Sequence, residues 1–100
     1  MIQSFADKDQ SFADKDTERL WNRERVRSID SRIHSVALRK LRQLGYAQTL
    51  DELRIPPGNR LEALKGDRRG QFSIRINDQW RICFRWSAAG PEEVEIVDYH

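Results

Sequence analysis

The sequence has little cysteine, proline or glycine, and it has no long apolar run. Cys83 is the single cysteine, so an internal disulfide and a cysteine-based zinc site are excluded, which fits a reducing cytoplasm. No apolar run approaches the ~20 residues of a membrane-spanning helix, and the N-terminus lacks the apolar segment of a secretory signal. We therefore expect residues 1–100, of which 38% are hydrophobic, to form a single soluble domain with one modest core and no membrane contact.

Several catalytic signatures are missing as well. The sequence shows no glycine-rich phosphate loop, no metal-ligand cluster and no nucleophilic triad, so we expect no metal and no other cofactor. Histidine occurs only at positions 34 and 100. His34 falls inside a predicted helix and is interpreted as a surface or boundary histidine, whereas the position of His100 in the last residues by itself favours a frayed segment.

The net charge of +2 hides an uneven distribution. Residues 31–85 carry 12 Lys and Arg against 5 Asp and Glu, whereas residues 86–100 carry none against 4. Such a basic region suggests a polyanionic partner, nucleic acid first. Part of the charge lies on a predicted helix (Arg32, Arg39, Lys40 and Arg42), where a solvated helix face is the favoured interpretation.

Two runs of alternating residues, 72–76 and 80–86, predict a β-hairpin. A three-residue loop, Asn77 to Gln79, places the apolar residues opposite one another and on one face. The predicted pairs are Phe72 with Phe84, Ile74 with Ile82, and Ile76 with Trp80. A two-residue loop would mix apolar and charged residues on the same face, so the three-residue loop is favoured.

The same register places Arg75 directly opposite Arg81 on the other face, with Arg85 further along. Like charges directly opposed in a sheet are destabilising unless something compensates them. A bound polyanion would compensate them. The alternative is that these arginines are splayed, solvated surface side chains.

The N-terminal region holds a tandem copy of QSFADKD at residues 3–9 and 10–16. One copy is expected to supply a first strand, from Ile2 to Phe5, and the other leads into a helix from about residue 14 or 17 to residue 25. Apolar spacing predicts a second helix over about 29–44, with Ser28 or Asp30 as its N-cap and Gly45 as its C′ residue.

Shorter elements complete the predicted chain. Residues 49–53 predict a helical turn, ended by the Pro-Pro-Gly of residues 56–58. Residues 61–64 predict a short strand, residues 65–70 a charged turn with glycines at both ends, and residues 93–97 a last strand. One strand, two helices and then further strands in a mainly antiparallel sheet indicate an α+β fold.

RLEALKGDRRGQFSIRINDQWRICFRW, followed by a terminal VEIVDYH, resembles the HigB-type toxins of the RelE/ParE toxin–antitoxin superfamily, also called plasmid maintenance killer proteins. The resemblance covers about residues 17–100. It implies two N-terminal helices packed on one face of a small twisted antiparallel sheet, with the other face basic and functional. It also implies ribosome-dependent cleavage of mRNA, which arrests translation and growth, in the bacterial cytoplasm. The implied partners are the ribosome, mRNA and a HigA-type helix-turn-helix antitoxin, with operator DNA bound only through the antitoxin complex.

The resemblance also assigns working residues. Lys65, Arg81, Asp98, Tyr99 and His100 match the family's catalytic positions. Weaker matches and the remaining candidates for RNA and phosphate binding are Arg68, Arg75, Arg85 and Glu62. Some relatives carry a histidine where this chain has Glu62, so this residue is either a base or simply a surface carboxylate.

RNA brings its own nucleophile, the 2′-hydroxyl, so cleavage without metal needs a base, an acid and cations around the phosphorane. We expect His100 to act as the general acid or base, and Asp98 to orient it. Tyr99 would stack on a base or assist proton transfer. Lys65, Arg75 and Arg81 would stabilise the developing charge. Two alternatives stay open: a ParE-like inhibitor of DNA gyrase, and a nucleic-acid-binding regulator without catalysis, which would bind RNA in a salt-sensitive manner.

Overall fold

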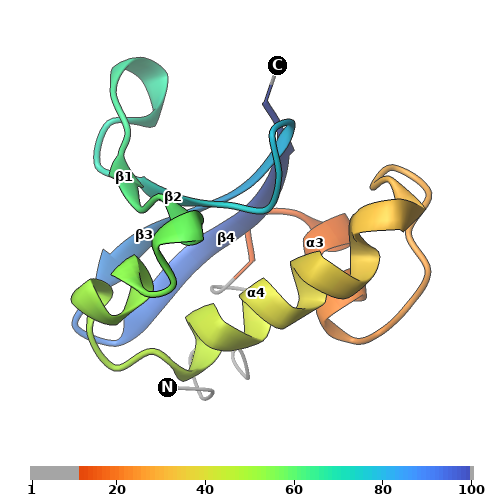
Figure 1. Ribbon diagram of the computed structural model, residues 1–100, viewed down its shortest axis with the longest axis horizontal. Coiled ribbons are helices and arrows are strands. Elements are labelled where there is room, and N and C mark those ends of the chain that lie inside the picture. The colour runs from red at the N-terminus through yellow and green to blue at the C-terminus, as the bar shows by residue number, and fades with distance from the viewer. Residues whose placement is uncertain (1–11, 100) are drawn as a thin grey trace.

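The computed structural model describes residues 12–99 and shows an α+β fold (Figure 1). Within these residues, two α-helices, α3 (Lys15–Trp21) and α4 (His34–Tyr46), precede an antiparallel sheet whose strand order is β1-β2-β3-β4. The strands are β1 (Glu62–Ala63), β2 (Phe72–Arg75), β3 (Trp80–Ser87) and β4 (Gly90–Asp98). The predicted α+β class is therefore confirmed. The strand expected at residues 2–5 lies outside the described residues.

Helix α3 begins at a side-chain cap and ends earlier than predicted. The Asp14 carboxylate accepts a hydrogen bond from the Thr17 amide at 3.3 Å, and acidic residues in the first turn suit the helix dipole. The predicted end at residue 25 is wrong. Arg23 adopts a left-handed conformation, and the amides of Arg23 and Glu24 donate to the carbonyls of Leu20 and Arg19, both at 2.9 Å. This hydrogen-bonding pattern is a Schellman motif, which stops the helix.

Helix α4 is preceded by a 3₁₀ turn, η1 (Ser31–Ile33), whose N-cap is Asp30, one of the two predicted caps. The Asp30 carboxylate accepts hydrogen bonds from the amide and guanidinium of Arg32, and these hydrogen bonds lower the pKa of Asp30 to about 2. The prediction that Gly45 lies just beyond the helix is wrong, because Gly45 is buried inside it. The chain leaves the helix at Ala47 in an extended conformation, so no left-handed residue is needed there.

The hairpin forms with the predicted register. Phe72 pairs with Phe84, Ile74 with Ile82, and the Ile76 amide donates to the Trp80 carbonyl at 2.9 Å. In the loop, the Asn77 side-chain oxygen accepts hydrogen bonds from the amides of Gln79 and Trp80, each at 2.8 Å. Asn77 thus satisfies the loop donors locally, which fixes a three-residue loop.

The pairing of β3 with β4 contains a bulge. Register shifts between Cys83 and Arg85, and Glu93 in β4 adopts a left-handed conformation with φ 52°. A bulge re-aims side chains locally. Here it places the Glu93 carboxylate 3.1 Å from Nε of Arg85. On the outer edge of β4, Phe12 forms a parallel bridge to Val94, so the second QSFADKD copy contacts the sheet.

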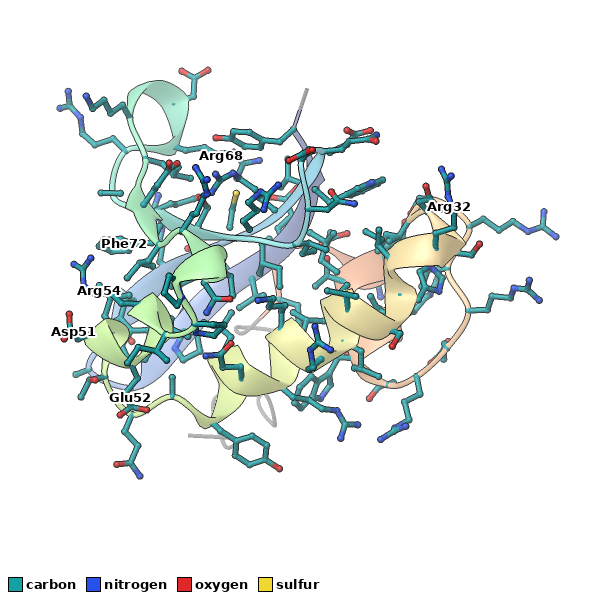
Figure 2. All side chains as sticks on the ribbon, in the orientation of Figure 1. Arg32, Asp51, Glu52, Arg54, Arg68 and Phe72 are labelled. Atoms are coloured by element: carbon teal, nitrogen blue, oxygen red, sulfur yellow. The ribbon has the colours of Figure 1, made fainter. Side chains whose placement is uncertain are left out.

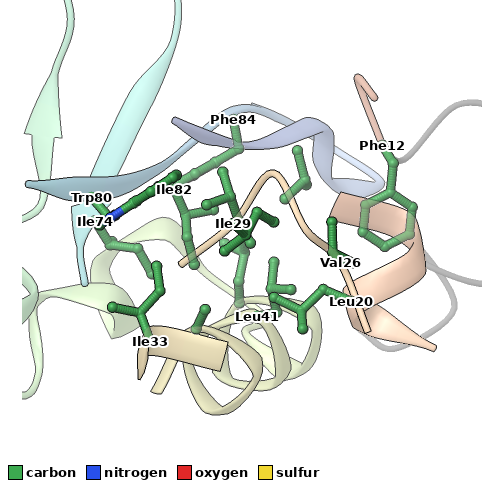
Figure 3. Packing of buried hydrophobic residues seen from close by; sticks show 14 of the residues in the cluster. Phe12, Leu20, Val26, Ile29, Ile33, Leu41, Ile74, Trp80, Ile82 and Phe84 are labelled. Atoms are coloured by element: carbon green, nitrogen blue, oxygen red, sulfur yellow. The ribbon is translucent and has the colours of Figure 1, made fainter. Parts of the chain in front are cut away.

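The hydrophobic core lies between the sheet and the helices (Figure 3). Ile74, Ile82 and Phe84 project from the sheet toward Leu41 of α4, and Leu20 closes the core from α3. All apolar residues predicted for the inner face of β3 up to Phe84 are buried, because the period-two alternation matches the pleat. No helix in the described part of the chain is long and apolar enough to cross a membrane.

The segment between α4 and β2 contains the predicted helical turn η2 (Leu50–Arg54) and the short β1, and both predictions are confirmed. A further 3₁₀ turn, η3 (Pro57–Asn59), follows where the prolines were expected to end regular structure. Asn59 is fully buried there. Its amide donates to the carbonyls of Leu53 at 3.1 Å and Ile55 at 3.4 Å, and its oxygen accepts from the ammonium of Lys40.

Replacing Asn59 with alanine should lower the free energy of unfolding by about 2–3 kcal/mol, because it leaves the buried Leu53 carbonyl without its Asn59 donor and the Lys40 ammonium without its acceptor. Urea unfolding followed by circular dichroism measures the loss. Asn22→Ala, at an exposed position, is the matched control and should cost much less. A loss below about 1 kcal/mol for Asn59→Ala would show that the segment is anchored in some other way.

Candidate functional site

Arginines gather on the side of the sheet that faces away from α4, and we call this side the arginine face. The predicted pairing of Arg75 with Arg81 is confirmed. The four arginines of this face are Arg68, Arg75, Arg81 and Arg85. Figure 2 shows Arg68 beside the strands, under the loop that contains the 3₁₀ turn η4 (Gly66–Arg68). One arginine therefore comes from the β1–β2 loop and three come from the two central strands.

Each of these arginines forms an ion pair with a carboxylate of the protein. Arg75 pairs with Asp78 in the hairpin loop, and Arg81 lies 3.5 Å from Glu62 on β1. The two opposed guanidinium groups are thus neutralised by different carboxylates, which offsets the repulsion between them. The compensation expected from a bound polyanion is supplied internally, and the side chains are paired and partly buried rather than splayed into solvent.

The other two pairs involve β4. Arg68 donates to the Gln71 side-chain oxygen at 3.0 Å and to the Glu95 carboxylate at 3.3 Å. Arg85 lies 3.1 Å from Glu93. A β-carbon on Gly70 would come within 2.7 Å of the Arg85 guanidinium, so this guanidinium lies directly over the glycine. Gly70 also has φ 91°, and this left-handed conformation favours glycine at the end of the β1–β2 loop.

Arg81 is the most enclosed of the four, and its side chain is only 14% exposed. Its Nη1 donates a 2.8 Å hydrogen bond to the hydroxyl of Ser73, which is fully buried on β2. The guanidinium carbon lies 5.7 Å from the ring centre of Tyr99, within cation–π range. Arg81 is therefore held by a hydroxyl, a carboxylate and an aromatic ring at once.

The C-terminal segment is anchored up to residue 99. Asp98 is the last residue of β4 and pairs with Trp80 at the start of β3. The Gln79 side chain donates to the Asp98 carboxylate at 3.1 Å, and the Gln79 carbonyl accepts from the Tyr99 amide. Asp98 and Tyr99 are thus anchored by the hairpin loop and the start of β3. His100 lies outside the described residues, and its assignment stays a prediction.

The structure brings Glu62, Arg81 and Tyr99 together, whereas Lys65 lies in the β1–β2 loop. This loop and the end of β4 project from the same side of the sheet, away from α4 (Figure 1). Lys65 is exposed and precedes η4, and its ammonium makes no hydrogen bond or ion pair within residues 12–99. Its charge is therefore available to a bound molecule.

Ser73 and Cys83 pair across β2 and β3 and form the floor beneath the arginines. Both are fully buried. Burial raises the pKa of the Cys83 thiol, and the nearby Glu95 acts in the same direction against Arg68 and Arg81. Cys83 is thus a buried packing residue of the sheet.

Concave pockets occur at the connection between α3 and α4, away from the arginine face. They are lined by residues that include Arg25, Arg27, Asp30 and His34, and by none of the predicted site residues. His34 contacts the Ile29 carbonyl through Nε2 at 2.8 Å, a local contact that matches its interpretation as a boundary histidine. Within residues 12–99, no group of His, Cys, Asp and Glu side chains is arranged to hold a metal ion.

Sequence reasoning did not assign Ser73, Gln79 and Glu95 to this site, nor Asp78 and Glu93, which pair with Arg75 and Arg85. Ser73 and Glu95 lie at outer-face positions of β2 and β4. Both pair with Cys83 of β3, one from each side. Their positions follow from the alternation, but their partners depend on the β1–β2 loop and on the bulge in β4. Gln79 is recognisable in the sequence only as a loop residue, and the tertiary structure brings the tail to it.

Comparisons with known proteins show the family of this chain. Residues 10–100 match the family described as the RelE-like toxin of the type II toxin–antitoxin system HigB. The chain belongs to this family. It is 46% identical to Toxin HigB-1 of Vibrio cholerae serotype O1 over 76 residues, which are 75% of this chain and 80% of the relative. It is also 34% identical over 58 residues to an uncharacterised protein of Haemophilus influenzae, covering 58% of this chain and 57% of that relative.

The resemblance found in the sequence is thereby confirmed, and the chain is a HigB-like toxin of a type II toxin–antitoxin system. Cleavage of mRNA is the known function of this toxin family, so the chain is a ribonuclease toxin in general terms. Type II systems pair each toxin with an antitoxin, so an antitoxin is its partner.

Proposed function

We propose that this toxin cleaves mRNA on the ribosome, and that the arginine face and the C-terminal Asp98, Tyr99 and His100 carry out the cleavage. One observation supports this most directly: the Arg81 guanidinium lies against the Tyr99 ring, 5.7 Å from its centre. A held cation beside the anchored end of β4 combines the two groups that cleavage by the 2′-hydroxyl requires, charge stabilisation and an acid–base segment.

In this proposal, Arg81 and Lys65 stabilise the negative charge that develops on the phosphorane. Arg81 is enclosed by Ser73, Glu62 and Tyr99. Its guanidinium therefore needs little rearrangement when the phosphorane forms. Lys65 is exposed on the β1–β2 loop and approaches the phosphate from another direction. Arg68, Arg75 and Arg85 contact neighbouring phosphates.

The C-terminal residues have the acid–base role. His100 is the general acid or base, since histidine titrates near neutral pH. Asp98 is anchored by Gln79, and it orients His100. Tyr99 stacks on a base or assists proton transfer while its ring covers Arg81. No metal ion takes part in this mechanism.

The ion pairs of the arginine face support dependence on the ribosome. Glu62, Asp78, Glu93 and Glu95 lie among the arginines, so the long-range attraction of this face for a polyanion is weak. An RNA phosphate must compete with these carboxylates for each guanidinium. We infer that free mRNA binds poorly and that ribosomal RNA supplies the additional contacts needed for docking.

The antitoxin is proposed to be a HigA-type helix-turn-helix protein that neutralises the toxin and brings it to operator DNA. The toxin itself would contact the ribosome and mRNA in the bacterial cytoplasm. Both proposals rest on the family to which the chain belongs.

The experiment is cleavage of a programmed mRNA by the purified toxin, with and without ribosomes, mapped to the nucleotide. We expect cuts in the decoding site only when ribosomes are present. His100→Ala should lower the cleavage rate by about 100-fold or more, as expected for loss of a general acid or base. His34→Gln is the matched control, because the other histidine of the chain lies on α4 and contacts Ile29.

Three outcomes would contradict the proposal in different ways. Equal cleavage of free mRNA would show that the ribosome is not required. Full activity of His100→Ala would show that His100 takes no part in cleavage. No cuts by folded toxin would overturn the nuclease and direct the next assay to supercoiling by DNA gyrase. Loss of activity with a chelator selective for transition metals, at constant magnesium and intact ribosomes, would overturn metal independence.

A further inference from the structure

We propose that Ser73 is a positioning residue that orients the Arg81 guanidinium for the cleavage step. This inference rests on the proposed function of Arg81. Ser73 lies on β2, is fully buried and accepts a 2.8 Å hydrogen bond from Nη1 of Arg81.

The burial of Ser73 needs an explanation, because a buried hydroxyl is costly unless it has a hydrogen-bond partner. Ser73 pairs with Glu62 on one side and Cys83 on the other. Its side-chain partner within residues 12–99 is Arg81. An apolar residue would satisfy the packing of a buried strand position, so the hydroxyl serves the arginine above it.

The contact to Ser73 is also the shorter of the two that Nη1 makes. Glu62 lies 3.5 Å from the same nitrogen, which is longer than a typical charge-assisted hydrogen bond of about 2.7–2.9 Å. Glu62 therefore supplies opposite charge, whereas Ser73 supplies the directional contact. The Tyr99 ring at 5.7 Å limits the tilt of the guanidinium plane.

These contacts leave part of the guanidinium available. Within residues 12–99, its contacts with Ser73 and Glu62 both engage Nη1. The donors on Nε and Nη2 remain for a phosphate, and two guanidinium donors bind two phosphate oxygens in a planar, bidentate pair. A guanidinium turned about its long axis would lose this geometry, so the orientation set by Ser73 affects the transition state more than the binding of substrate.

The test is single-turnover cleavage on programmed ribosomes at saturating toxin. Ser73→Ala should lower the rate constant about 10-fold and change the half-saturating toxin concentration by less than about 2-fold, since one directional contact is lost and the charges remain. Ser73→Cys keeps the size but is a weak acceptor, so it should behave like Ser73→Ala. Ser73→Thr keeps the hydroxyl and should restore most of the rate.

Thr17→Val is the matched control. Thr17 is also fully buried, and its hydroxyl accepts a 3.0 Å hydrogen bond from the Ile96 amide on the helix side of β4. Its loss should lower the melting temperature at least as much as Ser73→Ala does, with little change in the rate constant of the folded protein. In an Arg81→Ala background, Ser73→Ala should cause no further loss.

Full activity of Ser73→Ala, or equal loss in Ser73→Ala and Ser73→Thr at equal stability, would overturn the proposal. A second readout is independent of cleavage: nitrogen-15 NMR of the Arg81 guanidinium in the intact toxin. Restricted rotation should be seen in the wild type and lost in Ser73→Ala, and unchanged spectra would also overturn the proposal. If the wild type cleaves nothing, the proposed function fails, whereas this NMR comparison still decides whether Ser73 positions Arg81.

Discussion

Replacing Arg81 with alanine should lower the rate of mRNA cleavage by about 100- to 1,000-fold, the effect expected when a preorganised group that stabilises a developing negative charge is removed. Arg81 is 14% exposed and is held by Ser73, Glu62 and Tyr99. Its charge is therefore in place before the substrate arrives. The measurement is the single-turnover rate constant on programmed ribosomes.

Two variants separate charge from geometry. Arg81→Lys keeps the positive charge but loses the planar fork, so it should recover only a small part of the rate. Arg69→Ala removes an exposed arginine from the neighbouring β1–β2 loop and is the matched control, with an expected change below about 3-fold, because its charge is screened by solvent. A rate for folded Arg81→Ala within about 3-fold of wild type would show that the cation beside Tyr99 takes no part in cleavage.

Replacing Phe84 with alanine should lower the free energy of unfolding by about 3–5 kcal/mol. Phe84 is fully buried in the centre of β3, and its ring packs 6.2 Å from that of Phe72 between ring centres. Alanine would leave a cavity between the sheet and α4. A domain of this size is stable by about 5–15 kcal/mol, so the variant would retain only part of that margin.

Urea unfolding measures this loss as a lower midpoint at similar slope. Tyr46→Ala is the matched control: Tyr46 is 62% exposed at the end of α4, so little buried surface is lost. A loss below about 1 kcal/mol for Phe84→Ala would mean that the core at the centre of the sheet collapses around the missing ring.

The sequence predicted the hairpin in detail. Its register follows from the spacing of apolar residues and the length of the loop, and both are local properties of the chain. Pairing of Arg75 with Arg81 was therefore predictable from the residues of the hairpin alone. The N-cap Asp30 was predictable for the same reason, since a cap acts within three residues of its own position.

Helix ends were predicted less well. Gly45 resembles a C′ glycine in the sequence, yet it is buried inside α4 and the helix continues to Tyr46. In α3, the left-handed residue is Arg23, a residue type that gives no such signal. Helix ends depend on which carbonyls find partners and on the packing of the last turn, and neither is visible in the residue types.

The site was predicted as a set of cations but not as a network. Arg81 was identified from the sequence and its family resemblance, and its position beside Glu62 follows from the pairing of β1 with β2. The carboxylate partners of Arg68 and Arg85, in contrast, come from β4 and depend on its bulge at Glu93. Local patterns do not reveal contacts across such distances in the chain.

Some features of this toxin are therefore set by neighbouring residues in the sequence, and others by tertiary contacts. The sequence alone established the α+β class, the inner and outer faces of the hairpin and the family, because alternation, turns and motifs are properties of neighbouring residues. The folded chain alone decided that Ser73, Glu62 and Tyr99 surround Arg81, because these three residues come from three different segments and meet only when the strands pair. The electrostatics of the arginine face depend on these tertiary contacts, since the interaction energy of each charged group is set by its neighbours and its burial.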